Sequence, residues 1–243
     1  MNLILCIAGL NTRFHDVGFD IPKYLLPWNN TTIISEIITQ LSYGYDFDEI
    51  IILANSRDKY FKNNLYSTLE NVPNKHIYYI ADTLGQAHTA MVGASLLKYK
   101  NKPIAIMNGD TILKGRNFFD IEKFAIKNDA YVDVFISNNQ KYSYVKSDSN
   151  GYVQQIVEKI PISPFASSGL YCFKSSEFYM EQFNETVEMS QNSEIYVSNI
   201  LSNMISAKKF DIYSNGLDNN HKTIVLGSPY EYGIEFAKLM VTT

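Results

Sequence analysis

Short, continuous apolar runs alternate with helical apolar patterns along the first 110 residues of the chain. The runs predict fully buried strands at 3–8, 49–54, 76–80 and 103–107. Between them, apolar residues recur every three or four positions, which predicts helices at about 32–43, from Ser56 onward, and at 86–97. Thr31 or Thr32 can cap the first of these helices. This alternation is typical of a mostly parallel sheet with helices on both faces.

The pattern changes after residue 110. Strands with short connections are expected at 131–137, 142–146, 152–158 and 167–173, with a hairpin turn at Asp148–Gly151. Helices are expected at about 175–183 and 193–206, strands near 209–213 and 222–226, and a last helix from Pro229. We therefore predict a single α/β domain over 1–243, in which the second half extends the sheet of the first.

Composition argues against several classes of protein. The chain has 243 residues, is 46% hydrophobic and 19% charged, and carries a formal net charge of −4. This is ordinary for a globular protein and argues against nucleic-acid binding, because phosphate contacts need a basic excess. Cys6 and Cys172 lie in apolar runs and form no metal or disulfide pattern. Since no apolar stretch approaches a membrane span, we expect a cytoplasmic protein without a membrane partner.

Three polar loops directly follow predicted strands, at 9–13, 83–86 and 108–110. In open parallel sheets, ligands bind beyond the carboxyl ends of the strands. The sequence therefore predicts that these loops form a ligand site at one edge of the sheet.

The first loop, Ala8-Gly9-Leu10-Asn11-Thr12-Arg13, has the residue types of a phosphate cradle. Gly9 permits an unusual backbone angle and the close approach of a ligand. Asn11 tolerates left-handed geometry, and Arg13 adds a permanent cation. Backbone N–H groups and a guanidinium together suit a triphosphate. A plain turn is the alternative interpretation.

Lys23 lies shortly after this loop and directly follows Pro22. Proline biases the residue before it to extended geometry, so Lys23 is presented from a stiff segment. A rigidly held ammonium near a phosphate loop stabilises charge in phosphoryl chemistry. The alternative is a solvated surface lysine.

Together these two motifs resemble the sugar-phosphate nucleotidyltransferases, also called nucleotide-sugar pyrophosphorylases. Their signature is a first strand, a Gly-rich loop ending in Arg, and then a Pro-Lys pair. Further motifs of the family follow in order over nearly the whole chain: Leu84-Gly85-Gln86-Ala87, Asn108-Gly109-Asp110, Tyr142–Val145, Asn150-Gly151, Glu158-Lys159, Ser167–Tyr171 and Gly227–Glu231. The resemblance implies a Rossmann-like fold, with a nucleotide-binding half at 1–110 and an acceptor-binding half at 111–243.

The resemblance also implies an activity. A nucleoside monophosphate would pass from a nucleoside triphosphate to a sugar phosphate, with release of pyrophosphate, for polysaccharide or glycoconjugate precursors. Arg13 would hold the β- and γ-phosphates, Lys23 would bridge the α-phosphate and the attacking phosphate, and Asp110 would bind Mg²⁺. Catalysis would consist of positioning and charge stabilisation, without a covalent intermediate.

The resemblance assigns the remaining site residues. At the acceptor end, Glu158 would bond to substrate hydroxyls and Lys159 would pair with the substrate phosphate, beside Ser143 and Gly169. The expected nucleotide contacts, in which Gly85 presents its backbone to the base, are Ala8, Gly9, Leu10, Asn11, Gly85, Gln86, Asn108 and Gly109.

The chain departs from the family pattern at three positions. Asn11 replaces a loop glycine, and Ser143 replaces the glycine that follows the hairpin tyrosine. Val225 stands where the family usually has aspartate, two residues before the closing glycine. Mg²⁺ would then be held by one carboxylate with phosphates and water, or by a substitute such as Asp218; otherwise activity has been lost.

Several interpretations stay open. A non-sugar phosphate, as used by related cytidylyltransferases that act on choline phosphate, is favoured by Ser143, and a silent nucleotide-binding homologue is favoured by Val225. A retaining-type glycosyltransferase would need a DxD motif, but Asp46-Phe47-Asp48 precedes a strand instead of following one. The sequence also leaves open the base, the acceptor, the number of metals and the oligomeric state, for which analogy suggests a homodimer.

Overall fold

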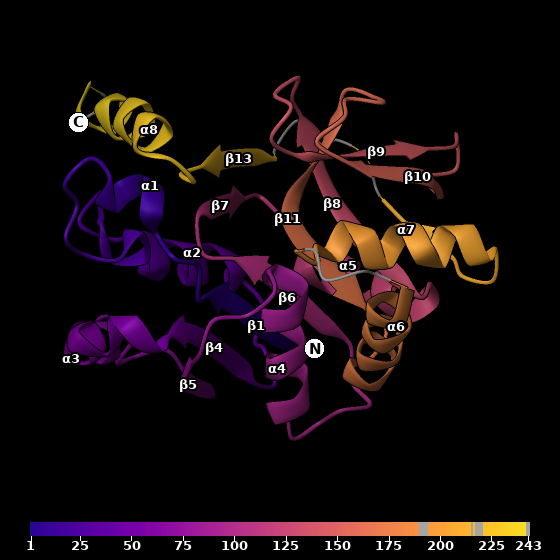
Figure 1. The fold of residues 1–243 in the computed structure, drawn as a ribbon, viewed down its shortest axis with the longest axis horizontal. Helices are drawn as coiled ribbons and strands as arrows, with labels where there is room; N and C mark the ends of the chain where they lie inside the picture. Colours follow the sequence, from indigo (N-terminus) through magenta and orange to yellow (C-terminus); the bar gives the residue numbers. More distant parts are fainter. Residues whose placement is uncertain (190–193, 215, 217–220, 242–243) are drawn as a thin grey trace.

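A nine-stranded mixed sheet forms the centre of the protein (Figure 1). The structure, a computed structural model, describes residues 1–189, 194–214, 216 and 221–241. Along the sheet the strands follow the order β10 (Val153–Glu158), β9 (Ser143–Ser147), β11 (Phe165–Phe173), β6 (Ile104–Asn108), β1 (Asn2–Ile7), β4 (Ile50–Asn55) and β5 (Lys75–Ile80). In addition, β8 (Ala130–Ile136) pairs with β11, and β12 (Ile212–Tyr213) pairs with β8.

The first half of the chain forms the parallel part of this sheet. β6, β1, β4 and β5 pair in parallel, with Leu3 opposite Ile50 and Ile4 opposite Ile106. These strands agree with the four apolar runs of the sequence. They bring the carboxyl ends of β1 and β6 side by side, where the polar loops begin.

The second half adds the antiparallel part. β11 runs antiparallel to β6, β8 and β9, and β9 runs antiparallel to β10. β8 and β9 therefore point the same way as β6 and β1. β12 also points this way, because it runs parallel to β8. The expected mixed, mostly parallel sheet is confirmed.

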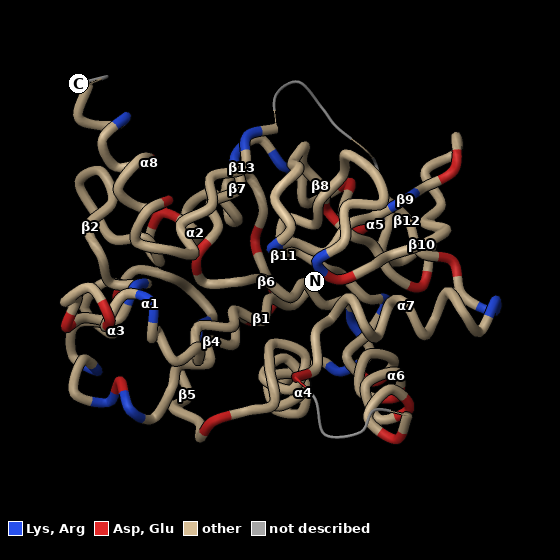
Figure 2. The backbone as a smooth tube through the Cα atoms, turned by 45° about the horizontal axis from the view of Figure 1, so that its top comes forward, with Lys and Arg blue, Asp and Glu red and all other residues tan. Residues whose placement is uncertain are grey.

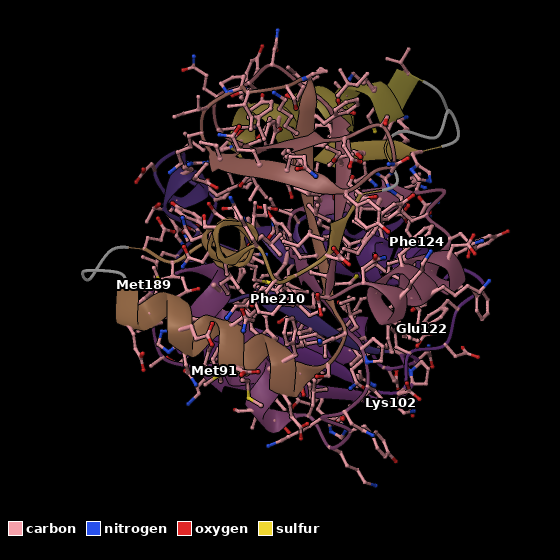
Figure 3. All side chains as sticks on the ribbon, turned by 90° about the vertical axis from the view of Figure 1, so that its right-hand side faces the viewer. Met91, Lys102, Glu122, Phe124, Met189 and Phe210 are labelled. Atoms are coloured by element: carbon pink, nitrogen blue, oxygen red, sulfur yellow. The ribbon has the colours of Figure 1, made fainter. Side chains whose placement is uncertain are left out.

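Helices cover both faces of the sheet. Leu3 and Leu5 of β1 face one apolar cluster and Ile4 faces the other, because successive strand residues point to opposite faces. The first cluster includes residues of α2 (Ile33–Leu41), α3 (Lys62–Thr68), α5 (Phe118–Lys127) and α8 (Pro229–Val241); the second includes residues of α4 (Gln86–Leu96), α6 (Ser176–Met189) and α7 (Val197–Ala207). In Figure 3, Met91 of α4 and Met189 of α6 lie on one side, and Glu122 and Phe124 of α5 lie on the other.

Several elements differ from the sequence prediction. A short helix, α1 (Thr12–His15), lies inside the expected first loop, and β7 (Thr111–Lys114) and α5 were not predicted. The side chain of Asn117 accepts hydrogen bonds from the backbone of Phe119 and Asp120 and so caps α5. Asn55, instead of the predicted Ser56, receives the capping bond of the next helical segment, η2 (Ser56–Phe61), whereas the Thr32 cap of α2 is confirmed.

A separate two-stranded sheet sits beside the main one. β13 (Lys222–Val225) pairs with β7 instead of joining the large sheet, as Figures 1 and 2 show. The buried Arg116 attaches this pair to β8: its guanidinium lies 3.0 Å from Asp133 and donates to the Lys222 carbonyl and Thr223 hydroxyl. These contacts of Arg116 hold β7, which directly follows Asp110, in place beside β8. Two further short strands, β2 (Pro27–Trp28) and β3 (Thr31–Thr32), pair before α2. None of the helices in the described ranges is long and apolar enough to cross a membrane.

Candidate active site

A cleft of about 800 Å³ opens at the carboxyl ends of β1 and β6. It is walled by the three loops that the sequence singled out and by strands of the antiparallel part. All the residues assigned to the site from the sequence line this cleft: Ala8, Gly9, Leu10, Asn11, Arg13, Lys23, Gly85, Gln86, Asn108, Gly109, Asp110, Ser143, Glu158, Lys159 and Gly169. The structure therefore brings the predicted site residues together in one cleft, while their roles toward substrates stay predictions.

Asn11 is the left-handed residue at which the first loop changes direction. This residue has φ 59°, the left-handed geometry that its side chain tolerates, and it begins α1. Its amide donates to the Ile21 carbonyl at 3.3 Å, and the Asn55 amide donates to the Ala8 carbonyl at 3.1 Å. The prediction of an unusual backbone angle at Gly9 is wrong, because Gly9 has no positive φ and a Cβ there would meet nothing within 4 Å.

Arg13 projects from α1 at the mouth of the cleft. Its side chain is exposed and has no hydrogen bond or ion pair with any of the described residues. The guanidinium therefore needs no internal partner to be displaced before it contacts an anion. This arrangement suits a group that receives phosphate oxygens.

Lys23 and Asp110 meet in the middle of the cleft. Lys23 Nζ lies 2.5 Å from Asp110 Oδ2, and the two side chains are 22% and 21% exposed. Pro22, directly before Lys23, is itself extended at ψ 137°. Burial raises the pKa of Asp110, but the Lys23 ammonium, together with Thr111 and Lys141, more than offsets this and keeps the pKa of the carboxyl below its usual value. Asp110 is thus ionised at neutral pH.

A second ion pair in the cleft was missed by the sequence analysis. The Lys141 ammonium contacts the Glu231 carboxylate, which also accepts a 2.7 Å hydrogen bond from the Ser228 hydroxyl. Burial lowers the pKa of Lys141, Asp110 opposes this shift, and Arg13 adds to it. Lys23 and Lys141 therefore both act electrostatically on Asp110, and Arg13 acts on Lys141.

The second loop needs its glycine. Gly85 has φ 108°, and a Cβ on it would lie 2.7 Å from the Ile195 carbonyl oxygen. The approach is close because the Ile195 N–H donates to the Leu84 carbonyl at 2.7 Å and the Ile195 carbonyl accepts from the Ala87 N–H at 3.1 Å. The loop expected to contact the base is thus paired, strand-like, with the segment before α7.

The third loop packs against two neighbours. The Gln86 amide donates a hydrogen bond to Asn108 Oδ1, which joins two predicted nucleotide contacts. Gly169 has φ 89°, and a Cβ on it would lie 2.3 Å from the Asn108 amide nitrogen. The glycine at position 169 is therefore required by Asn108, whatever it contacts in a substrate.

The residues expected to bind the acceptor are centred on Glu158. Its Oε2 accepts hydrogen bonds from the Ser143 hydroxyl and, at 2.7 Å, from the Ser198 hydroxyl of α7. Lys159 has a left-handed φ of 60°, and its ammonium donates to the Tyr196 hydroxyl at 3.1 Å, which raises the pKa of Lys159. Ser198 bonds to Glu158 from α7, and Tyr196 lines the cleft from the N-cap of that helix. Neither residue was predicted, because both lie far along the chain from the other site residues.

Val225 occupies the place expected for a second acidic residue. It pairs with Thr111 across β13 and β7 and lines the cleft next to Asp110. An apolar side chain there cannot bind a metal. Asp218, the substitute considered from the sequence, lies outside the described residues. In the described ranges, no group of three or more His, Cys, Asp and Glu side chains is arranged to hold a metal ion.

Comparison with protein families and curated proteins finds clear similarities. A family model described as "Nucleotidyl transferase" matches residues 2–220. The bifunctional protein GlmU of Methanococcus aeolicus is 23% identical over 241 residues, which are 95% of this chain and 52% of that protein. The chain therefore spans about half the length of this relative.

Solved structures share the fold over almost the whole chain. A nucleoside-diphosphate-sugar pyrophosphorylase from Vibrio cholerae RC9 superposes with a TM-score of 0.82 at 25% identity, covering 98% of this chain and 100% of that one. A Bacillus anthracis structure named as a glucose-1-phosphate thymidylyltransferase, in complex with sucrose, gives a TM-score of 0.80 at 18% identity, covering 98% and 94%. At that identity the second likeness concerns the fold.

Proposed function

The chain belongs to the nucleotidyl transferase family and is a nucleotidyltransferase, and from this premise we propose that it transfers a nucleoside monophosphate from a nucleoside triphosphate to a sugar phosphate, with release of pyrophosphate. The observation that carries the proposal is the Lys23–Asp110 pair in the middle of the cleft. Arg13 and the first loop line the same cleft, and so do Glu158 and Lys159. The name of the similar Vibrio cholerae RC9 structure, a nucleoside-diphosphate-sugar pyrophosphorylase, supports a sugar phosphate as the acceptor class.

In this mechanism the residues position and stabilise charge. A phosphate oxygen of the acceptor attacks the α-phosphorus, the bond from that phosphorus to the β-phosphate oxygen breaks, and pyrophosphate leaves with the bonding electrons. The unpaired guanidinium of Arg13 binds the departing phosphates, and the Lys23 ammonium binds the α-phosphate and the incoming phosphate. Both cations lower the barrier by meeting charge that grows on the oxygens.

Mg²⁺ fits the donor chemistry of this cleft. Asp110 offers an ionised carboxylate, which is the ligand type that Mg²⁺ prefers, and the ion usually takes its other ligands from phosphates and water. Bound there, Mg²⁺ supplies positive charge to neutralise the phosphate oxygens. Asp110 would hold it, and Lys23 would turn from Asp110 to the substrate.

A non-sugar phosphate is the second candidate for the acceptor. Ser143 and Ser198 both donate to Oε2 of Glu158, so fewer positions on this carboxylate remain for acceptor hydroxyls. This observation favours an acceptor that makes few hydroxyl contacts at this end. The division into a nucleotide half, 1–110, and an acceptor half, 111–243, is part of the proposal, because Ser143, Glu158 and Lys159 all lie beyond residue 110.

Pyrophosphate release tests the proposal. Purified protein is incubated with Mg²⁺ and each of CTP, UTP, GTP, ATP and dTTP, against a panel of sugar phosphates and non-sugar phosphates such as choline phosphate. Release that requires one triphosphate and one sugar phosphate supports the proposal, and release only with a non-sugar phosphate supports the second candidate. No release across the panel, together with thermal stabilisation by a triphosphate, would indicate a nucleotide-binding homologue without transfer activity.

A further inference from the structure

A second carboxylate borders the space beside Asp110. A Cβ placed on Gly227 would lie 3.3 Å from Asp110 Oδ2 and 3.7 Å from Glu231 Oε2. The two carboxylates therefore face one gap, which exists because residue 227 has no side chain. Val225, at the position where the family pattern has aspartate, adds no oxygen to this gap.

The backbone explains how Glu231 reaches this place. β13 pairs with β7 directly after Asp110, and the Leu226 N–H donates to the Asp110 carbonyl at 2.7 Å. The chain then turns at Gly227 into α8, whose first turn contains Glu231. The Ser228 hydroxyl donates to Glu231 Oε2 at 2.7 Å and fixes the side chain toward the cleft.

Both carboxylates already bind cations of the cleft. Lys23 pairs with Asp110, and Lys141 pairs with Glu231, whose Oε1 also lies 3.5 Å from the Tyr142 hydroxyl. The Glu231 side chain is 19% exposed, so it is screened from bulk water and still open to the cleft. A divalent cation placed between the carboxylates would meet two oxygen ligands, directly or through the waters that Mg²⁺ usually keeps.

We propose that Glu231 is the second acidic residue of the magnesium site and replaces the carboxylate that is missing at Val225. The proposal rests on the proposed function for the presence of Mg²⁺. Lys141, which pairs with Glu231 when no divalent ion is bound, then becomes free to contact the substrate phosphates together with Arg13 and Lys23.

Binding of Mn²⁺ alone tests this proposal without a turnover assay. Free Mn²⁺ is measured by electron paramagnetic resonance while the protein is titrated. We expect saturable binding in the wild type, loss of binding in Asp110→Asn, and binding weakened by about tenfold or more in Glu231→Gln. The matched control is Glu235→Gln, since Glu235 lies one turn further along α8, also pairs with a lysine, and does not line the cleft.

A rescue variant distinguishes the loss of a metal ligand from a change in folding. Val225→Asp, introduced into Glu231→Gln, returns a carboxylate to the same gap and is expected to recover Mn²⁺ binding. Equal Mn²⁺ affinities of Glu231→Gln and Glu235→Gln, or no saturable binding in the wild type, would overturn the proposal.

Pyrophosphate release, measured on the same preparations, separates the two proposals. If Mn²⁺ binding depends on Glu231 but no substrate pair releases pyrophosphate, the transfer function fails and the metal site stands. If pyrophosphate is released but the Mn²⁺ affinity does not change in Glu231→Gln, the proposed metal site is wrong and the proposed function is supported.

Discussion

The Lys23 ammonium lies 2.5 Å from Asp110 Oδ2, although 87 positions separate the two residues in the chain. The pair joins the segment after the first loop to the end of β6, and it places one cation and one anion at the centre of the cleft. Each neutralises the charge of the other. On the proposed function, triphosphate and Mg²⁺ take over these two contacts together, so the resting enzyme is already arranged for both.

Replacement of Lys23 tests its role at the reacting phosphates. Lys23→Ala should lower kcat by about 10²- to 10³-fold, because one preorganised donor to developing charge is worth that much. Circular dichroism should remain that of the wild type, since the side chain lies at the cleft and not in the core. Lys127→Ala, at an exposed position of α5, is the control. A Lys23→Ala enzyme with wild-type kcat would exclude Lys23 from the reaction.

Replacement of Arg13 tests which phosphates it contacts. Arg13→Ala should weaken binding of the nucleoside triphosphate by about tenfold, because a charged hydrogen bond contributes about 1.5–3 kcal/mol. Binding of the corresponding monophosphate should change little, since it lacks the β- and γ-phosphates. Calorimetric titration of both nucleotides provides the measurement. Equal losses for the two would place Arg13 away from the leaving phosphates.

Ser198 is expected to be a positioning residue for Glu158. Ser198→Ala removes the 2.7 Å hydrogen bond to Glu158 Oε2, and the KM for the acceptor should rise by about tenfold. The KM for the triphosphate should stay constant, because Ser198 lies at the acceptor end. Steady-state kinetics with each substrate varied in turn gives both values. Ser202→Ala, one turn further along α7, is the matched control, and similar kinetics in the two variants would remove Ser198 from acceptor recognition.

Asp58 is expected to lower stability near neutral pH. It accepts a 3.0 Å hydrogen bond from Tyr24, next to Lys23, and burial raises the pKa of its carboxyl. A raised pKa means that the folded state holds the proton more strongly, so stability falls as the pH rises above the unfolded pKa of about 3.9. Asp58→Asn should therefore raise Tm near neutral pH and leave it unchanged in acid below that pKa. A constant Tm difference at all pH values would contradict this explanation.

The sequence predicted the strands of the parallel part and the location of the cleft, because both follow from local pattern. Leu3 to Ile7 is apolar throughout and is buried on both faces, and strand-end loops of a parallel sheet must meet at one edge. The left-handed Asn11 was predictable for the same reason, since its side chain tolerates that geometry.

What the sequence could not show depends on tertiary packing. Ser198 lies on a helix whose spacing resembles that of any amphipathic helix, and Glu231 ends a motif that the sequence singled out without a role for this residue. Only the packing of α7 and α8 places the two side chains beside Glu158 and Asp110. α5 was missed although Asn117 caps it, because its apolar positions, with a buried Phe118, Ile121 and Ala125, were not recognised as helical. Gly9 was assigned a backbone role that Asn11 performs.

Backbone hydrogen bonds join Ile195 to Leu84 and Ala87. They connect the loop around Gly85 with the segment before α7, so these two segments form one unit that moves together. Beside Ile195 lies Tyr196, which holds the Lys159 ammonium, while Gly85 lies between the two residues that Ile195 contacts. On the proposed function, a shift that one substrate imposes on this unit is transmitted to the subsite of the other. Thermodynamic linkage makes that coupling reciprocal. Selectivity for the nucleotide and for the acceptor therefore cannot be changed independently by grafting the Gly85 loop alone, and the two loops would have to be exchanged together.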